Sequence, residues 1–113
     1  MNELELKTNK TVAAVRENEI MLKQAIVDHF DYTDPSQKTG TSKGGFMISI
    51  NKQIKAAFGE SREGFTIEQW ALLNSALSGI QEIIKNGEKN GELRKNIKVK
   101  IKEYISKYAG MMI

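Results

Sequence analysis

Apolar residues recur at intervals of three and four along most of this 113-residue chain, and this spacing constrains the fold more than any other feature. It places side chains on one face of an α-helix, because about 3.6 residues complete a turn. The first stripe, within residues 11–30, consists of Val12, Val15, Leu22, Ile26 and Phe30. Ile20, Met21 and Val27 lie off that stripe. They predict either two packing neighbours for this helix or a surface that meets another chain.

The second stripe covers residues 46–58 and consists of Phe46, Met47, Ile50, Ile54, Ala57 and Phe58. It occupies about a third of a helical wheel, which is typical of an amphipathic helix. Alternation of apolar and polar residues near 46–50 also fits a short strand, but the helical pattern matches more positions. Gly59 tolerates the left-handed backbone that ends many helices, so we expect the helix to stop there.

The third stripe has the clearest start signal in the chain. Thr66 stands three residues before Gln69, which is the spacing of a capping box. Phe65 and Trp70 flank this start and predict a hydrophobic staple. A wide apolar face follows, which is typical of a central helix covered on two sides. Gly79 lies inside this helix, and we expect it to let a neighbouring helix approach closely.

The pairs Asn86-Gly87 and Asn90-Gly91 predict a turn after the third stripe. The fourth stripe consists of Leu93, Ile97, Ile101, Tyr104, Ile105 and Tyr108. Residues 96–102 also alternate like a half-buried strand that follows a hairpin-like turn. The helical spacing continues to Tyr108, so we favour a helix here as well.

Together the stripes predict an all-α fold: a small, four-helix bundle-like domain over residues 10–113. The alternative is an α+β fold with short strands near 46–50 and 96–102. Residues 1–9 are polar, and we expect a flexible N-terminus there. A long, mobile loop is expected over residues 31–45, which contain the only proline and three glycines.

Composition bears on the compartment. The chain has no cysteine, which fits a reducing environment and excludes disulfides and thiolate metal sites. The first six residues are acidic where a signal peptide would be basic. No apolar run approaches the roughly 20 residues that span a bilayer. We therefore expect a cytoplasmic protein that makes no use of a membrane.

Charge is distributed unevenly along the chain. Residues 1–36 carry a net charge of −3, residues 37–84 carry +1 and residues 85–113 carry +5. A basic segment of this kind binds nucleic acid or an acidic protein. Alternatively, the basic last helix packs against the acidic first helix. Fourteen of the seventeen basic residues are lysines, which counts against sequence-specific reading of DNA by arginine.

The candidate residues for nucleic-acid binding belong to the basic segment. They share one edge of its predicted helix: Arg94, Lys95, Lys98 and Lys102. Three or four phosphate contacts would give weak binding that depends strongly on salt. Tyr104 and Tyr108 could stack on bases, but their place on the apolar stripe favours packing in the core.

Catalytic chemistry has little support in the residue inventory. His29 is the only histidine, and no G-x-S-x-G nucleophile motif is present. The three aspartates around His29 lack any recognised metal-ligand spacing, so a solvated helix end is the favoured interpretation. The glycine-rich residues 40–45 lack the order of a phosphate-binding loop. We expect no enzyme activity, no cofactor and no metal.

Two functions from different classes remain. The first is a non-enzymatic binding or regulatory protein, an inhibitor or adaptor, that contacts a protein partner through Ile20, Met21 and Val27. A homo-oligomer formed through its helices is the variant of this function in which the partner is a second copy. The second is a nucleic-acid-binding regulator that uses the basic C-terminal segment. In its lysine-, isoleucine- and asparagine-rich composition the chain resembles small proteins of phages and mobile elements in bacteria with AT-rich genomes. That resemblance implies no residue roles.

Overall fold

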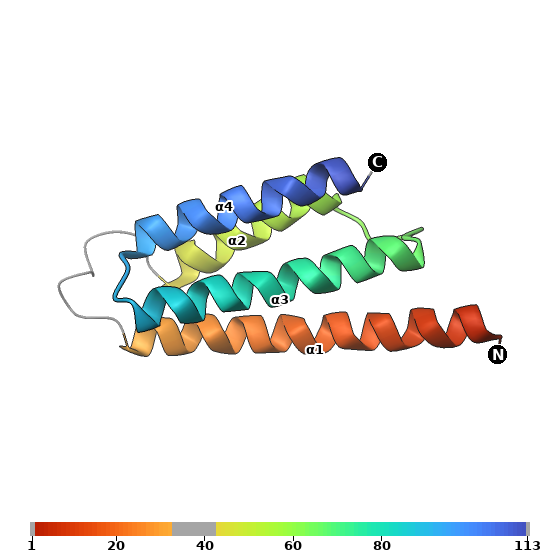
Figure 1. Ribbon diagram of the computed structural model, residues 1–113, viewed down its shortest axis with the longest axis horizontal. Helices are drawn as coiled ribbons and strands as arrows, with labels where there is room; N and C mark the ends of the chain where they lie inside the picture. Colours follow the sequence, from red (N-terminus) through yellow and green to blue (C-terminus); the bar gives the residue numbers. More distant parts are fainter. Residues whose placement is uncertain (1, 33–42, 113) are drawn as a thin grey trace.

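The computed structural model describes residues 2–32 and 43–112, with side chains placed except at residues 30–32, 43 and 44. This part of the chain forms four helices, α1 (Glu3–Tyr32), α2 (Lys43–Phe58), α3 (Ile67–Lys89) and α4 (Arg94–Met111) (Figure 1). The predicted all-α fold is confirmed. The alternative strands near 46–50 and 96–102 are wrong, because those residues lie inside α2 and α4.

The helices form two layers of parallel pairs. α1 and α3 run in one direction, and α2 and α4 run in the other (Figure 1). α1 packs along α3, α3 along α4 and α4 along α2, whereas α1 and α2 meet over a shorter stretch. α1 and α4 therefore lie across the bundle from each other, on an elongated molecule of 53 × 23 × 21 Å.

One apolar core runs between the α1–α3 layer and the α2–α4 layer, and all four predicted stripes contribute to it. Its buried members are Val15, Leu22, Ala25, Ile26, Phe46, Ile50, Ile54, Phe58, Leu73, Ala76, Leu77, Ile80, Ile84, Ile97, Ile101 and Ile105. Burying each large side chain of this set contributes about 1.5–3 kcal/mol. Packing of the stripes against one another therefore holds the helices together.

A polar link crosses the contact between α1 and α3. The side-chain amide of buried Gln81 donates to the backbone carbonyl of Asn18 at 3.2 Å and to its side-chain oxygen at 3.1 Å. Asn18 in turn donates to Asn74 Oδ1 at 2.6 Å. Because a buried amide is costly to leave unpaired, this link favours one register of α1 on α3.

The predicted start of α3 is confirmed in both of its features. Gln69 N–H donates to Thr66 Oγ1 at 3.2 Å, and Thr66 N–H donates to Gln69 Oε1 at 2.9 Å, which completes the capping box. The rings of Phe65 and Trp70 pack edge to face, with centroids 5.3 Å apart. The staple fixes the angle at which the chain enters the helix.

α1 begins at Glu3, earlier than the apolar stripe within residues 11–30 indicates. The stretch expected to be flexible is therefore helical from its third residue. Asn2 Oδ1 accepts a hydrogen bond from the Glu5 backbone N–H at 2.8 Å, which is the geometry of an N-cap. Acidic Glu3 and Glu5 in the first turn also favour the positive end of the helix dipole.

Other helix boundaries are partly as predicted. The C-cap at Gly59 is confirmed, with φ of +92° and its N–H donating to the Lys55 carbonyl at 2.8 Å. The turn at Asn90-Gly91 is also confirmed, with Gly91 at φ +67°. The turn predicted at Asn86-Gly87 is wrong, because α3 continues to Lys89. Gly87 is buried there against the side chain of Ile97.

The two ends of the loop predicted over residues 31–45 are helical. Residues 31 and 32 belong to α1, and residues 43–45 belong to α2. Residues 33–42, on which the rest of that prediction falls, lie outside the described residues.

Candidate functional site

The three residues predicted for protein binding lie on α1 but do not form one surface. Ile20 is 69% exposed and Met21 is 46% exposed, whereas Val27 is half-buried. Ile20 and Val27 are seven residues apart and share one side of the helix, while Met21 points about 100° away from Ile20. The structure therefore groups Ile20 with Val27 and separates Met21 from both.

A groove lies where α1 and α2 meet over their short contact. It encloses about 250 Å³, and its floor consists of the core side chains Leu22, Ile54 and Leu77, with Met47 beside them. We call it the α1–α2 groove. These three core side chains are buried, with 9% or less of each residue exposed, so the groove ends at the outer surface of the apolar core.

Charged side chains form the rim of the α1–α2 groove. Lys23 comes from α1, Lys55 from α2 and Arg62 from the connection between α2 and α3. Arg62 makes an ion pair with Glu19 across the rim. Both partners are more than a third exposed, so this pair contributes little to stability, about 0–1 kcal/mol.

A second exposed isoleucine lies on α2 and lines none of the hollows described for this helix. Ile48 on α2 is 57% exposed and lies one residue after Met47, which lines the groove. Ile48 also belongs to the alternating pattern near residues 46–50, which obscures its place on a helix. A helical wheel places it on the face of α2 opposite Phe46 and Ile50, and this signal would have identified it.

Three of the four residues predicted for nucleic-acid binding line a common hollow. The hollow has a volume of about 340 Å³ and lies between α4 and α2. Its wall on α4 includes Lys95, Lys98 and Lys102, and its wall on α2 consists of Ser49 and Gln53. Lys95 and Lys102 are exposed, and Lys98 is half-buried.

Arg94 does not belong to this surface. Its placement beside the lysines was wrong, because only 9% of Arg94 is exposed. The helical period explains the difference, since Arg94 lies three residues before the core residue Ile97 and faces the same way.

The lysine hollow continues into a smaller, more apolar one. Gln53 and Lys102 line both. The second hollow encloses about 170 Å³ between α2 and α4, and its other lining residues are Ala56, Ala57, Ile105, Ser106 and Ala109. We call the two together the α2–α4 groove. One end has a lysine rim, and the other has a floor of small and aliphatic side chains.

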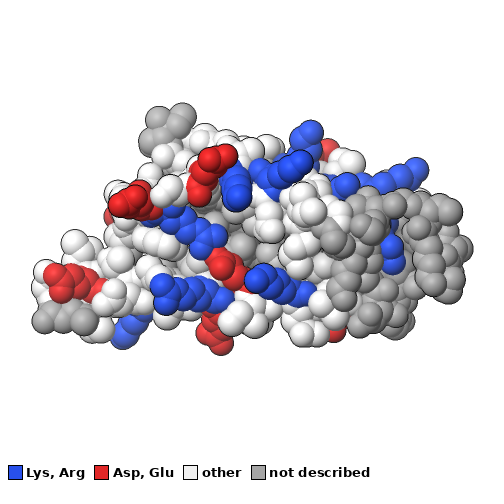
Figure 2. Space-filling view, turned by 180° about the vertical axis from the view of Figure 1, so that it is seen from behind, with Lys and Arg blue, Asp and Glu red and all other residues white. Residues whose placement is uncertain are grey.

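Charge separates between the two layers. α2 and α4 together carry nine Lys or Arg and one Glu, whereas α1 and α3 carry six Lys or Arg and nine Asp or Glu. Figure 2 shows basic side chains gathered over the upper half of the molecule, most of them toward the end near the residues drawn in grey. The alternative that the acidic first helix packs against the basic last one is wrong, because α1 and α4 lie on opposite sides of the bundle.

His29 lies in a buried polar cluster, so its predicted place at a solvated helix end is wrong. Only 2% of the residue is exposed, and Nδ1 lies 3.4 Å from Glu88 Oε1. Burial, together with the nearby charge of Arg94, lowers the pKa of His29. Burial and the charge of Asp28 raise the pKa of Glu88, against the opposite effect of Lys85. His29 lines neither groove, so it is not placed to act on a ligand in them.

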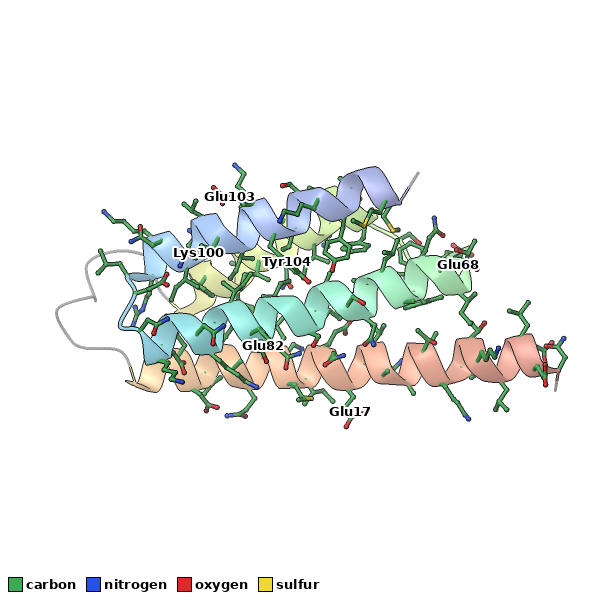
Figure 3. The ribbon with its side chains drawn as sticks, in the orientation of Figure 1. Glu17, Glu68, Glu82, Lys100, Glu103 and Tyr104 are labelled. Atoms are coloured by element: carbon green, nitrogen blue, oxygen red, sulfur yellow. The ribbon has the colours of Figure 1, made fainter. Side chains whose placement is uncertain are left out.

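The two tyrosines of α4 pack inward, as their place on the apolar stripe predicted. Tyr104 lies between α4 and α3 (Figure 3), and its hydroxyl donates to the Ser75 carbonyl at 3.1 Å. Its hydroxyl is also 2.8 Å from that of Tyr108. Burial and the hydrogen bond with Tyr108 raise the pKa of Tyr104. Neither tyrosine lines the groove that holds the lysines.

Searches for other features add two findings. Among the described residues, no three or more histidine and carboxylate side chains are placed to hold a metal ion. In the same part of the chain, every helix is too short or too polar to cross a bilayer. Comparison of the chain with models of protein families, with curated proteins and with solved structures gives no significant match.

Proposed function

We propose that this protein is a non-enzymatic binding protein of the cytoplasm, an inhibitor or adaptor, that docks a protein partner on the α1–α2 groove. One observation supports the proposal: the core side chains Leu22, Ile54 and Leu77 line the bottom of a groove, and the exposed residue Ile20 follows Glu19, which lines the same groove on α1. An apolar depression with a polar rim is the arrangement in which interfaces place their anchor residues.

The partner's contribution follows from the chemistry of this groove. An aliphatic or aromatic side chain would bury itself against Leu22 and Leu77, and Ile20 would pack around it. Lys23, Lys55 and Arg62 on the rim favour acidic groups next to that side chain. The ion pair between Arg62 and Glu19 is weak enough to rearrange when the partner binds.

The experiment uses Ile20→Asp and a matched control. Leu4 lies on the same helix and is 61% exposed, but it is about four turns away from Glu19, the first residue of α1 that lines the groove, so Leu4→Asp tests the effect of a new surface charge alone. A tagged chain is used to capture partners from the cells that encode it, and the captured protein is then purified and titrated directly. We expect Ile20→Asp to weaken binding about tenfold or more, and Leu4→Asp to leave it unchanged.

Two results would refute this assignment. Either both variants bind the purified partner as the parent chain does, or Ile20→Asp lowers the helical circular dichroism signal and so acts through folding. Ile20 is largely exposed, so we expect the fold to remain intact.

The second function, a nucleic-acid-binding regulator, is favoured by the charge difference between the layers and by the common hollow of Lys95, Lys98 and Lys102. With three lysines at the contact, the affinity for a duplex should fall steeply with salt, with a logarithmic slope of about −3. Titration of generic duplex and single-stranded DNA at two salt concentrations tests it. Absence of binding at low salt eliminates this function.

A further inference from the structure

The α2–α4 groove has a shape that suits an elongated ligand. Its lining residues on α4 run from Lys95 to Ala109, which at 1.5 Å per residue corresponds to about 21 Å. Its lining residues on α2 run from Ser49 to Ala57 along the opposite wall. α2 and α4 are parallel neighbours, so the groove follows both helices (Figure 1). A helix of about 15 residues has the length to fill it.

The charge of the groove indicates an acidic ligand. α2 carries no acidic residue, and the only one on α4 is Glu103. Glu103 points outward from α4 and does not line the groove (Figure 3). Lys95, Lys98 and Lys102 therefore line the groove without a carboxylate among its lining residues. The net charge of about +8 on the α2–α4 layer also opposes binding of the same layer of a second copy.

The apolar end of the groove distinguishes an acidic helix from a nucleic acid. The lining of the smaller hollow includes the apolar side chains of Ala56, Ile105 and Ala109. These side chains have no group that can bind a phosphate. A helix with one apolar face and acidic flanks would use both ends, because its apolar residues pack on this floor while its carboxylates meet the lysine rim. A duplex would contact only the three lysines.

We infer that the α2–α4 groove is a second docking site, which binds an acidic amphipathic helix of a partner protein. It shares α2 with the α1–α2 groove but uses the other side of that helix. The inference goes beyond the proposed function, because it concerns a different surface and a different partner chemistry. A protein with both sites would join two partners, as an adaptor does.

The probe is a fluorescent, end-capped peptide of about 15 residues, with leucines spaced alternately three and four apart and glutamates on the flanks. Fluorescence anisotropy measures its binding to the full chain at about 0.15 M salt. We expect micromolar binding by this peptide, and binding at least about tenfold weaker by a scrambled peptide of the same composition. A duplex DNA of similar charge should also bind more weakly.

Two pairs of variants locate the site. Ala56 is exposed and lines the apolar end, so Ala56→Trp fills the groove without entering the core, and Ala71→Trp on α3 is its control. Lys102 lines both hollows, so Lys102→Glu is paired with Lys107→Glu on the same helix. We expect Ala56→Trp and Lys102→Glu to weaken the peptide about tenfold each, and both controls to bind as the parent does.

Three results would overturn the inference. Equal binding of the scrambled peptide, or an unchanged affinity of Ala56→Trp, would reduce the groove to a charged surface. Tighter binding of the duplex, lost in Lys102→Glu but kept in Ala56→Trp, would assign the site to nucleic acid. Self-association of the parent chain in sedimentation equilibrium, abolished by Ala56→Trp, would make a second copy the occupant. The Ile20→Asp variant should bind the peptide normally, which separates failure here from failure of the α1–α2 groove.

Discussion

The contact between α3 and α4 and the contact between α1 and α2 join similar amphipathic helices but close in different ways. At the α3–α4 contact, glycines on α3 leave room for large side chains of α4. A Cβ added at Gly79 would overlap the side chain of Tyr104, and one added at Gly87 would overlap that of Ile97. At α1–α2, Lys23 and Lys55 line the rim and a groove of about 250 Å³ remains. The molecule is tightly packed along one contact and open along the other.

This difference separates the parts of the protein that stabilise it from the parts that bind. A closely packed contact gains dispersion energy and loses water, but it leaves no surface for a partner. An open contact gives up some of that packing and leaves a depression that a partner's side chain can enter. Both proposed docking sites border α2, whose two sides face hollows.

The largest expected effect comes from shortening one isoleucine at the α3–α4 contact and one at the α1–α2 groove. Ile97 is fully buried over Gly87, so Ile97→Ala should leave a cavity and lower the free energy of unfolding by about 3–4 kcal/mol. Ile54 is 9% exposed and lines the α1–α2 groove, so Ile54→Ala enlarges an existing hollow and should cost less, about 2 kcal/mol. Urea unfolding of both variants measures the difference. Equal losses would mean that the groove is closed in solution.

Two glycine substitutions should change the free energy of unfolding by smaller amounts and in opposite directions. Gly79→Ala pushes Tyr104 away from α3 and weakens its hydrogen bond to the Ser75 carbonyl, so it should cost about 1–2 kcal/mol even though alanine favours helix. Gly110 lies in α4 with nothing near its missing Cβ. There Gly110→Ala should stabilise the protein by a few tenths of a kcal/mol. Thermal melts followed by circular dichroism give both shifts, and a stabilising Gly79→Ala would contradict the close packing.

The sequence was most informative where the determining interactions are local. Thr66, Gln69, Phe65 and Trp70 lie within six residues of one another, and their predicted cap and staple are both present. The start of α1 was predictable in the same way, because Asn2 and Glu5 have the spacing of an N-cap and its third helical residue. That signal was overlooked in favour of the apolar stripe.

Local signals failed where distant parts of the chain decide the outcome. Asn86-Gly87 has the composition of a turn, but Ile97 packs over Gly87 and the helix continues. No local pattern says which helices become neighbours, so the pairing of α2 with α4 and both grooves could not be derived. The burial of Arg94 was within reach, because its spacing to Ile97 places it on the core-facing side.

The last prediction concerns the buried polar cluster at the end of the closely packed region. His29 lies next to Glu88 of α3, and the positive charge of Arg94 of α4 acts on its imidazole. The charges of Asp28 and Lys85 act on Glu88. Its pKa is lowered in the folded state, so below about pH 6.5 the unfolded chain binds more protons than the folded one. Stability should therefore fall as the pH decreases from 7.5 to 5.5, by at most about 1.4 kcal/mol per pH unit.

The raised pKa of Glu88 acts in the opposite direction, because the folded state then binds protons more readily than the unfolded one. Replacing the imidazole with an amide that does not titrate, His29→Gln, should flatten the dependence between pH 7.5 and 5.5. Urea midpoints at several pH values measure the slope, so the variant's own loss of stability does not enter. Parallel slopes in the parent and the variant would show that His29 titrates alike in the folded and unfolded chains, and that the cluster is open to water as the α1–α2 groove is.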